Sequence, residues 1–174
     1  MTTGGPVILG FDGSSAARQA VRDAADLLGP QPALVVTVWE AGRRFEPMTL
    51  PVPGFELPPA ALDLRSAAEM DEAAYESAKQ TARQGAQLAR EAGFTAATAL
   101  AVADDLTPAD TLLRVAREHD SPGIVVGAHG HRKLSELLLG STSDTLVHKS
   151  DRPVVVVRAR AGDHSRTPDT AGAG

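Results

Sequence analysis

The sequence contains no cysteine. This absence excludes disulfide bonds, thiolate nucleophiles and cysteine-ligated zinc or iron–sulfur sites. Aromatic residues make up only 3% of the chain, so we do not expect successive bases to stack on aromatic side chains, as they do in proteins that bind single-stranded nucleic acid. The 17 Lys and Arg residues are outnumbered by 22 Asp and Glu residues, which gives a formal net charge of −5. Because binding to a phosphate backbone depends mainly on Lys and Arg, a nucleic-acid partner is not expected.

Long hydrophobic runs are also missing. No segment reaches the roughly 18 apolar residues that a transmembrane helix needs, so no membrane partner is expected. The first residues lack the basic stretch and apolar core of a signal peptide, which favours a cytoplasmic protein. Hydrophobic residues make up 43% and charged residues 22% of the 174 positions, as in soluble folded chains of about one domain. We expect one domain over residues 1–160, followed by a disordered tail at 161–174 that is rich in small and polar residues.

Short runs rich in β-branched residues alternate with segments of helical periodicity. The expected strands cover residues 7–11, 34–39, 95–102, 124–126 and 154–157. The expected helices cover residues 17–28, 64–92, 108–116 and 141–149, the last two beginning with caps at Thr107 and Ser141. Such alternation predicts an α/β fold, a three-layer open parallel five-stranded sheet of order 3-2-1-4-5 with helices on both faces, similar to a Rossmann fold.

One segment interrupts this alternation. Residues 41–59 contain five prolines, too many for a helix or a central strand. We expect an excursion beside the carboxyl edge of the sheet.

Glycines follow the fourth expected strand in a regular pattern. Gly127, Gly130, Gly140 and Ser141 fit G-x2-G-x9-G-[ST], which begins directly after that strand and ends where the fourth helix begins. Phosphate oxygens bind well to the free amides at a helix start, and glycine removes the side chain that would block their approach. The pattern therefore indicates a phosphate-binding loop. No G-x4-G-K-[ST] or G-x-G-x-x-G pattern is present, so neither a P-loop nor a dinucleotide-binding fingerprint is expected.

This arrangement resembles the universal stress protein family, in particular its ATP-binding branch. The resemblance covers residues 6–158 and includes the Asp12-Gly13-Ser14 turn, the glycine pattern and the closing Arg152-Pro153 strand start. It implies a protein that binds ATP, with Mg²⁺ carried by the nucleotide, and regulates a stress response according to nucleotide occupancy. It also implies a homodimer formed through the last strand, Val154–Val157, a short apolar strand expected at the sheet edge.

The resemblance further implies a set of nucleotide-binding residues. Asp12 is expected to meet the adenosine, Val38 to contact adenine through its backbone, and Val126 to pack on the nucleoside. The ribose and phosphate loop and the phosphate cradle are expected at Gly127, His129, Gly130, Gly140, Ser141, Thr142 and Ser143.

Several alternatives remain open. The glycines can be plain turn residues, Asp12 can cap the first helix, and Val38 can belong to the core. The spacing of His129 and His131 suits a zinc site poorly, so no metal ligands are expected. No catalytic residue is evident, but a slow ATP hydrolase or ATP-dependent transferase that uses His129 or His131 is the second hypothesis. A dimeric stress protein that binds no nucleotide is the third.

Overall fold

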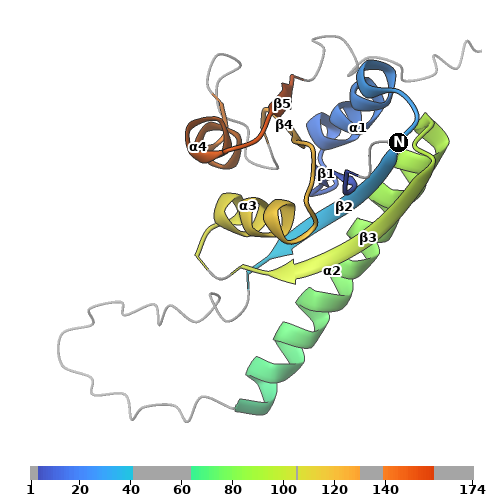
Figure 1. Cartoon of the computed structure of the whole chain (residues 1–174). Helices are drawn as coiled ribbons and strands as arrows, with labels where there is room; N and C mark the ends of the chain where they lie inside the picture. Colours follow the sequence, from blue (N-terminus) through green and yellow to red (C-terminus); the bar gives the residue numbers. More distant parts are fainter. Residues whose placement is uncertain (1–3, 41–63, 105, 130–138, 159–174) are drawn as a thin grey trace, which may run out of the picture.

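The computed structural model describes residues 4–40, 64–104, 106–129 and 139–158. The predicted excursion at 41–59 and the predicted tail at 161–174 lie outside these ranges. Five strands and four helices are formed within them, in strict alternation (Figure 1). Their order is β1 (Val7–Gly10), α1 (Ser15–Leu28), β2 (Pro32–Trp39), α2 (Leu64–Ala92), β3 (Ala96–Ala103), α3 (Pro108–Glu118), β4 (Ile124–Gly127), α4 (Ser141–Lys149) and β5 (Val154–Val157).

The strands form one parallel sheet in the order β3-β2-β1-β4-β5, which confirms the predicted fold. β1 pairs with β2 on one side and with β4 on the other. The strand order reverses at this point. The helices that follow β1 and β4 therefore pack on opposite faces of the sheet, α1 on one and α4 on the other, and this arrangement leaves a crevice beyond the carboxyl ends of the two strands. None of the helices in the described ranges combines the length and the apolar character needed to cross a membrane.

Side chains of β1 alternate between two cores, as expected of a strand covered on both faces. Leu9 packs with residues of α1 and α2, whereas Ile8 packs with residues of α3 and α4. Figure 1 shows the same arrangement, with α1 and α2 on one side of the sheet and α3 and α4 on the other. The helix residues in both cores are mostly alanine and leucine, and none of them is aromatic.

The start of α3 agrees with the sequence prediction. The hydroxyl of Thr107 accepts a hydrogen bond from the Asp110 amide at 3.1 Å and donates one to the Asp110 carboxylate at 2.7 Å. Pro108 occupies the first turn, where its missing N–H removes nothing from the helix.

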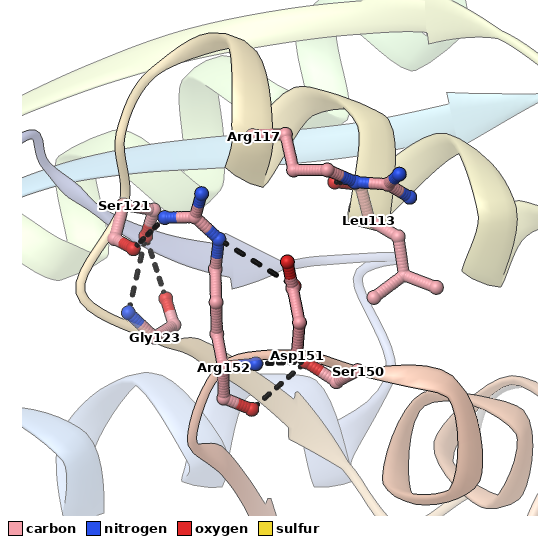
Figure 2. A network of polar contacts seen from close by, with 7 residues as sticks. All are labelled: Leu113, Arg117, Ser121, Gly123, Ser150, Asp151 and Arg152. Atoms are coloured by element: carbon pink, nitrogen blue, oxygen red, sulfur yellow. Dashed lines mark hydrogen bonds and ion pairs between the residues drawn. The ribbon is translucent and has the colours of Figure 1, made fainter.

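A polar network joins the amino end of β4 to the segment before β5 (Figure 2). Arg152 donates a hydrogen bond from its guanidinium to the carbonyl of Ser121, and its own amide donates to the hydroxyl of Ser150. The Ser121 hydroxyl in turn donates to the carbonyl of Gly123 at 2.8 Å. These bonds satisfy backbone groups where β4 begins and hold β5 in register beside it.

Candidate functional site

A pocket of about 210 Å³ opens at the carboxyl ends of β1, β2 and β4. The strand order reverses there, which is where open α/β sheets bind their ligands. Apolar side chains from the strands and from α3 form most of its wall, and polar groups come from the loops that follow the strands. The pocket is lined by Gly10, Phe11, Asp12, Ser14, Ala17, Val36, Val38, Pro108, Leu112, Val126, Gly127, His129 and Thr142.

The turn after β1 forms one side of the pocket. Asp12 accepts a hydrogen bond from the Ser14 amide at 2.9 Å, and the Ser14 hydroxyl accepts one from the Ala17 amide at 3.1 Å. Ser14, not Asp12, therefore caps α1. Asp12 shapes the turn that places this cap beside the pocket. At the base of the turn, the buried Thr37 hydroxyl donates to the carbonyl of Phe11 at 2.7 Å and ties β1 to β2.

Gly127 ends β4 against the first turn of α1. A Cβ on this residue would lie 2.8 Å from the carbonyl carbon of Ala16 and 2.9 Å from the amide nitrogen of Ala17. Real Cβ atoms do not come so close to backbone atoms. Glycine at this position therefore has a packing role, since it lets the start of α1 lie over the end of β4.

The start of α4 forms the opposite side and differs from the prediction. The N-cap residue is Gly140, with extended backbone angles (φ −67°, ψ 155°), and no side chain caps the helix within the described residues. Ser141 was expected to be the cap, but it already belongs to the helix. A helix that starts without a side-chain cap leaves its first amides available to an anion, and the helix dipole favours negative charge there.

Ser143 lies behind this helix start and supports it. Its hydroxyl is 3.0 Å from the carbonyl oxygen of Ala128 and 2.9 Å from that of Gly140. The Gly140 amide also donates to the Ala128 carbonyl, at 2.7 Å. These bonds hold the start of α4 beside the end of β4, with Ser143 buried to 2% exposure.

His129 is partly buried on the pocket wall between these two sides. Its Nε2 atom is buried and has no hydrogen-bond partner among the described residues. A buried nitrogen without a partner is costly unless something binds it. A ligand that supplies a hydrogen-bonding oxygen in the pocket fits this atom.

Six of the residues expected from the sequence share the pocket wall, and they come from β2, from β4, from the loops after β1 and β4 and from the start of α4: Asp12, Val38, Val126, Gly127, His129 and Thr142. Gly140 and Ser141 lie at the start of α4, where Thr142 joins them to the pocket. Gly130 and His131 lie outside the described residues. In the described ranges no group of three His, Asp or Glu side chains is placed to hold a metal ion.

Sequence reasoning did not assign the other residues of this wall to the site, among them Phe11, Leu112 and Ser14. Phe11 and Leu112 read as core residues, and each is almost fully buried, but both also line the pocket. Ser14 carried a usable signal, because a serine just before a segment of helical periodicity is a typical N-cap. The starts of α1, α3 and α4 all reach the pocket through Ser14, Pro108 and Thr142. Their positive dipole ends therefore face a common space that suits an anionic ligand.

The sheet order and the pocket at its reversal point define a doubly wound α/β protein with a pocket at the carboxyl edge, where such folds bind their ligands. The model of the universal stress protein family matches residues 5–158. The chain belongs to the universal stress protein family.

Individual relatives agree with this assignment. The chain is 34% identical to universal stress protein MJ0577 of Methanocaldococcus jannaschii over 53 residues, which span 30% of this chain and about a third (33%) of that relative. The solved structure of MJ0577 has a TM-score of 0.69 to this chain at 20% identity, covering 90% of this chain and 97% of that one. Universal stress protein UspA from Lactobacillus plantarum has a TM-score of 0.66 at 22% identity, covering 88% and 97%. Both likenesses show the shared fold.

Proposed function

We propose that this protein binds ATP, with Mg²⁺ carried by the nucleotide, in the pocket at the carboxyl edge of the sheet. The observation that carries the proposal is the start of α4, which lacks a side-chain cap and lies beside the pocket that Thr142 lines. Free amides at a helix start bind phosphate oxygens, and the apolar wall beyond them, which includes Val38 and Val126, suits a nucleoside. Asp12 and His129 add polar groups to the wall of the same pocket.

Two structural neighbours support a nucleotide ligand. One universal stress protein has been solved in complex with cAMP and shares this fold with a TM-score of 0.54. Another, from Archaeoglobus fulgidus, has been solved in complex with dAMP, with a TM-score of 0.52. Because both ligands are adenine nucleotides, we propose that this chain also binds one. We choose ATP because the uncapped start of α4 offers backbone amides to further phosphate groups.

We further propose that the protein is cytoplasmic and acts in a stress response as a homodimer whose surface changes with nucleotide occupancy. The second copy pairs through β5, which is the edge of the sheet that the described residues form. All four of its valines are only half-buried. Pairing with a second β5 would cover them and satisfy backbone groups along the edge.

Two measurements test nucleotide binding. The protein is purified without added nucleotide and denatured, and any released nucleotide is identified by mass spectrometry. Protein that releases nothing is titrated by calorimetry with ATP and Mg²⁺, and with cAMP and AMP as comparison ligands. Release of adenine nucleotide near one per chain, or a binding isotherm for ATP, supports the proposal. An empty protein that gives no heat with any of the three overturns it.

The second candidate function is slow ATP hydrolysis or ATP-dependent transfer, favoured by the buried and unpartnered Nε2 of His129 on the pocket wall. A His129→Ala variant that keeps ATP binding but loses turnover would support it. Turnover of the unaltered protein no faster than in buffer would reject it.

A further inference from the structure

The last third of α2 approaches Phe11, the residue directly after β1, at Gly85. A Cβ on Gly85 would lie 2.7 Å from Cδ1 and 2.9 Å from Cγ of the Phe11 ring, and 2.7 Å from Cγ1 of Val35. Glycine inside a helix costs about 1 kcal/mol relative to alanine. Glycine compensates by leaving space at this position, because the helix backbone itself lies against the Phe11 ring.

Phe11 joins this helix contact to the pocket. The residue is 3% exposed, packs in the core on the α1 and α2 side of the sheet, and lines the pocket. Its amide donates to the carbonyl of Val36 at 2.9 Å, and its carbonyl accepts from Thr37 at 2.7 Å. The Arg18 guanidinium lies over the ring, 5.9 Å from its centroid.

These contacts leave the ring little freedom. The backbone of Phe11 is held by β2, and α2 closes the space on one side of the ring. A methyl group added at position 85 must therefore move α2 away or move the ring toward its other neighbours, the pocket among them. Asp12 follows Phe11 directly in the chain and lies on the same wall.

The geometry points to Gly85 as a positioning residue of the nucleotide pocket. We propose that its missing side chain sets the position of the Phe11 ring, and through it the position of the Asp12 turn, although Gly85 does not line the pocket. This inference rests on the proposed function. If nucleotide binds, its affinity then depends also on α2, a helix that carries none of the site residues expected from the sequence.

A pair of variants tests the contact with the Phe11 ring separately from the contact with Val35. Val35→Ala removes two methyl groups beside the position of the new Cβ, and Gly85→Ala in this background adds one methyl group. The remaining close contact is the one with Phe11. We expect the double variant to bind ATP about tenfold more weakly than Val35→Ala alone, as overpacking typically costs enough for such a change. Equal affinity in the two variants overturns the proposal.

Nuclear magnetic resonance gives a readout that needs no nucleotide. Adding Gly85→Ala to Val35→Ala should shift the amide signals of Asp12, Gly13 and Ser14. Ser77→Ala, at an exposed position of the same helix, should leave them in place. If the unaltered protein binds no ATP, the proposed function fails, and these signals still decide whether Gly85 positions the pocket wall. Unshifted signals overturn the role of Gly85 even if ATP binds.

A second pair of variants, made in a Phe11→Leu background, tests whether Gly85 acts through the Phe11 ring or through a general effect on helix α2. Phe11→Leu removes ring atoms near position 85, so Gly85→Ala should cost less stability and less ATP affinity in this background than in the unaltered chain. Urea unfolding and calorimetry measure the two differences. Fully additive effects would show that Gly85 does not act through Phe11, and would overturn the proposal.

Discussion

Gly127 lies so close to Ala16 that a Cβ on Gly127 would come within 2.8 Å of the Ala16 carbonyl carbon. The end of β4 and the first turn of α1 are therefore in backbone contact, although more than a hundred residues separate them in the chain. The same glycine begins the predicted phosphate-binding pattern. Glycine at position 127 allows α1 to pack closely on the sheet, and it also leaves room for the proposed nucleotide.

Replacement of Gly127 by alanine is expected to destabilise the fold. The added methyl group meets backbone atoms of α1, which cannot rotate away, and overpacking of this kind typically lowers the free energy of unfolding by about 1–3 kcal/mol. Urea unfolding of Gly127→Ala measures the change. Gly4→Ala is a matched control, because a Cβ there has nothing within 4 Å, and its effect should stay within about 0.5 kcal/mol. Equal stability of the two variants would contradict the packing role.

Filling the pocket is expected to abolish ATP binding without unfolding the protein. Val38 is half-buried near the end of β2 and lines the pocket, so Val38→Trp places a large ring inside a space of about 210 Å³. Calorimetry measures binding, and circular dichroism confirms the fold. The control Val147→Trp changes a side chain that is 50% exposed on α4 and does not line the pocket. ATP binding by Val38→Trp as tight as that of the unaltered protein would place the ligand elsewhere.

Removal of one backbone donor from β5 is expected to break the proposed homodimer. The carbonyls of Pro153 and Val157 accept hydrogen bonds from the amides of Ile124 in β4 and of Ala128 directly after it. Since backbone groups alternate in direction along a strand, the N–H of Val156 faces the outer edge. Val156→Pro removes this donor while β5 still pairs with β4. Light scattering after size exclusion should then report a monomer.

The conservative variant Val156→Thr keeps the N–H and serves as the control for the dimer. It should remain dimeric under the same conditions. A monomeric unaltered protein, or a Val156→Pro variant that stays dimeric, would contradict dimerisation through β5.

The Asp110 carboxylate is expected to stabilise the fold only above acidic pH. A hydrogen bond from the Thr107 hydroxyl, and then one from the Lys149 ammonium group, lower the pKa of Asp110 below its ordinary value of 3.8. A carboxyl group whose pKa is lower in the folded state contributes stability above its unfolded pKa, and this contribution is lost as the pH falls through the folded pKa. Asp110→Asn should therefore be less stable than the unaltered protein at pH 7, and the difference should fade below pH 3.8.

Two measurements check this dependence. Urea unfolding at pH 7 and over an acidic series follows the stability difference, and a carboxyl titration by nuclear magnetic resonance locates the pKa directly. Lys149→Met removes the 3.2 Å contact between α4 and α3 and should move the Asp110 pKa back toward its ordinary value. An Asp110 pKa at or above 3.8 in the unaltered protein would contradict the assigned contacts.

Local sequence patterns were enough to predict the strands, the helices and several of their ends. The start of α3 is the clearest example, because Thr107, Pro108 and Asp110 interact within one turn and their spacing is visible in the sequence. The start of α4 shows where such reasoning stops. Serine is a usual N-cap residue, so the sequence favoured Ser141. In the structure, Gly140 takes the cap position, and the Ser143 hydroxyl binds the carbonyl of Ala128, fifteen residues away in the chain.

The sequence by itself determined the alternation of strands and helices and the spacing of the glycines, because each follows from periodicity or from residues close together in the chain. The parallel sheet order was predicted from that alternation together with the usual topology of doubly wound sheets. Only the tertiary structure decided what the glycines lie against. Gly127 contacts the backbone of Ala16, and Gly85 lies against the Phe11 ring. Both contacts join elements far apart in the chain, and their distances depend on how closely each helix packs on the sheet. Side-chain volumes across the whole core set that packing, and no local pattern records it.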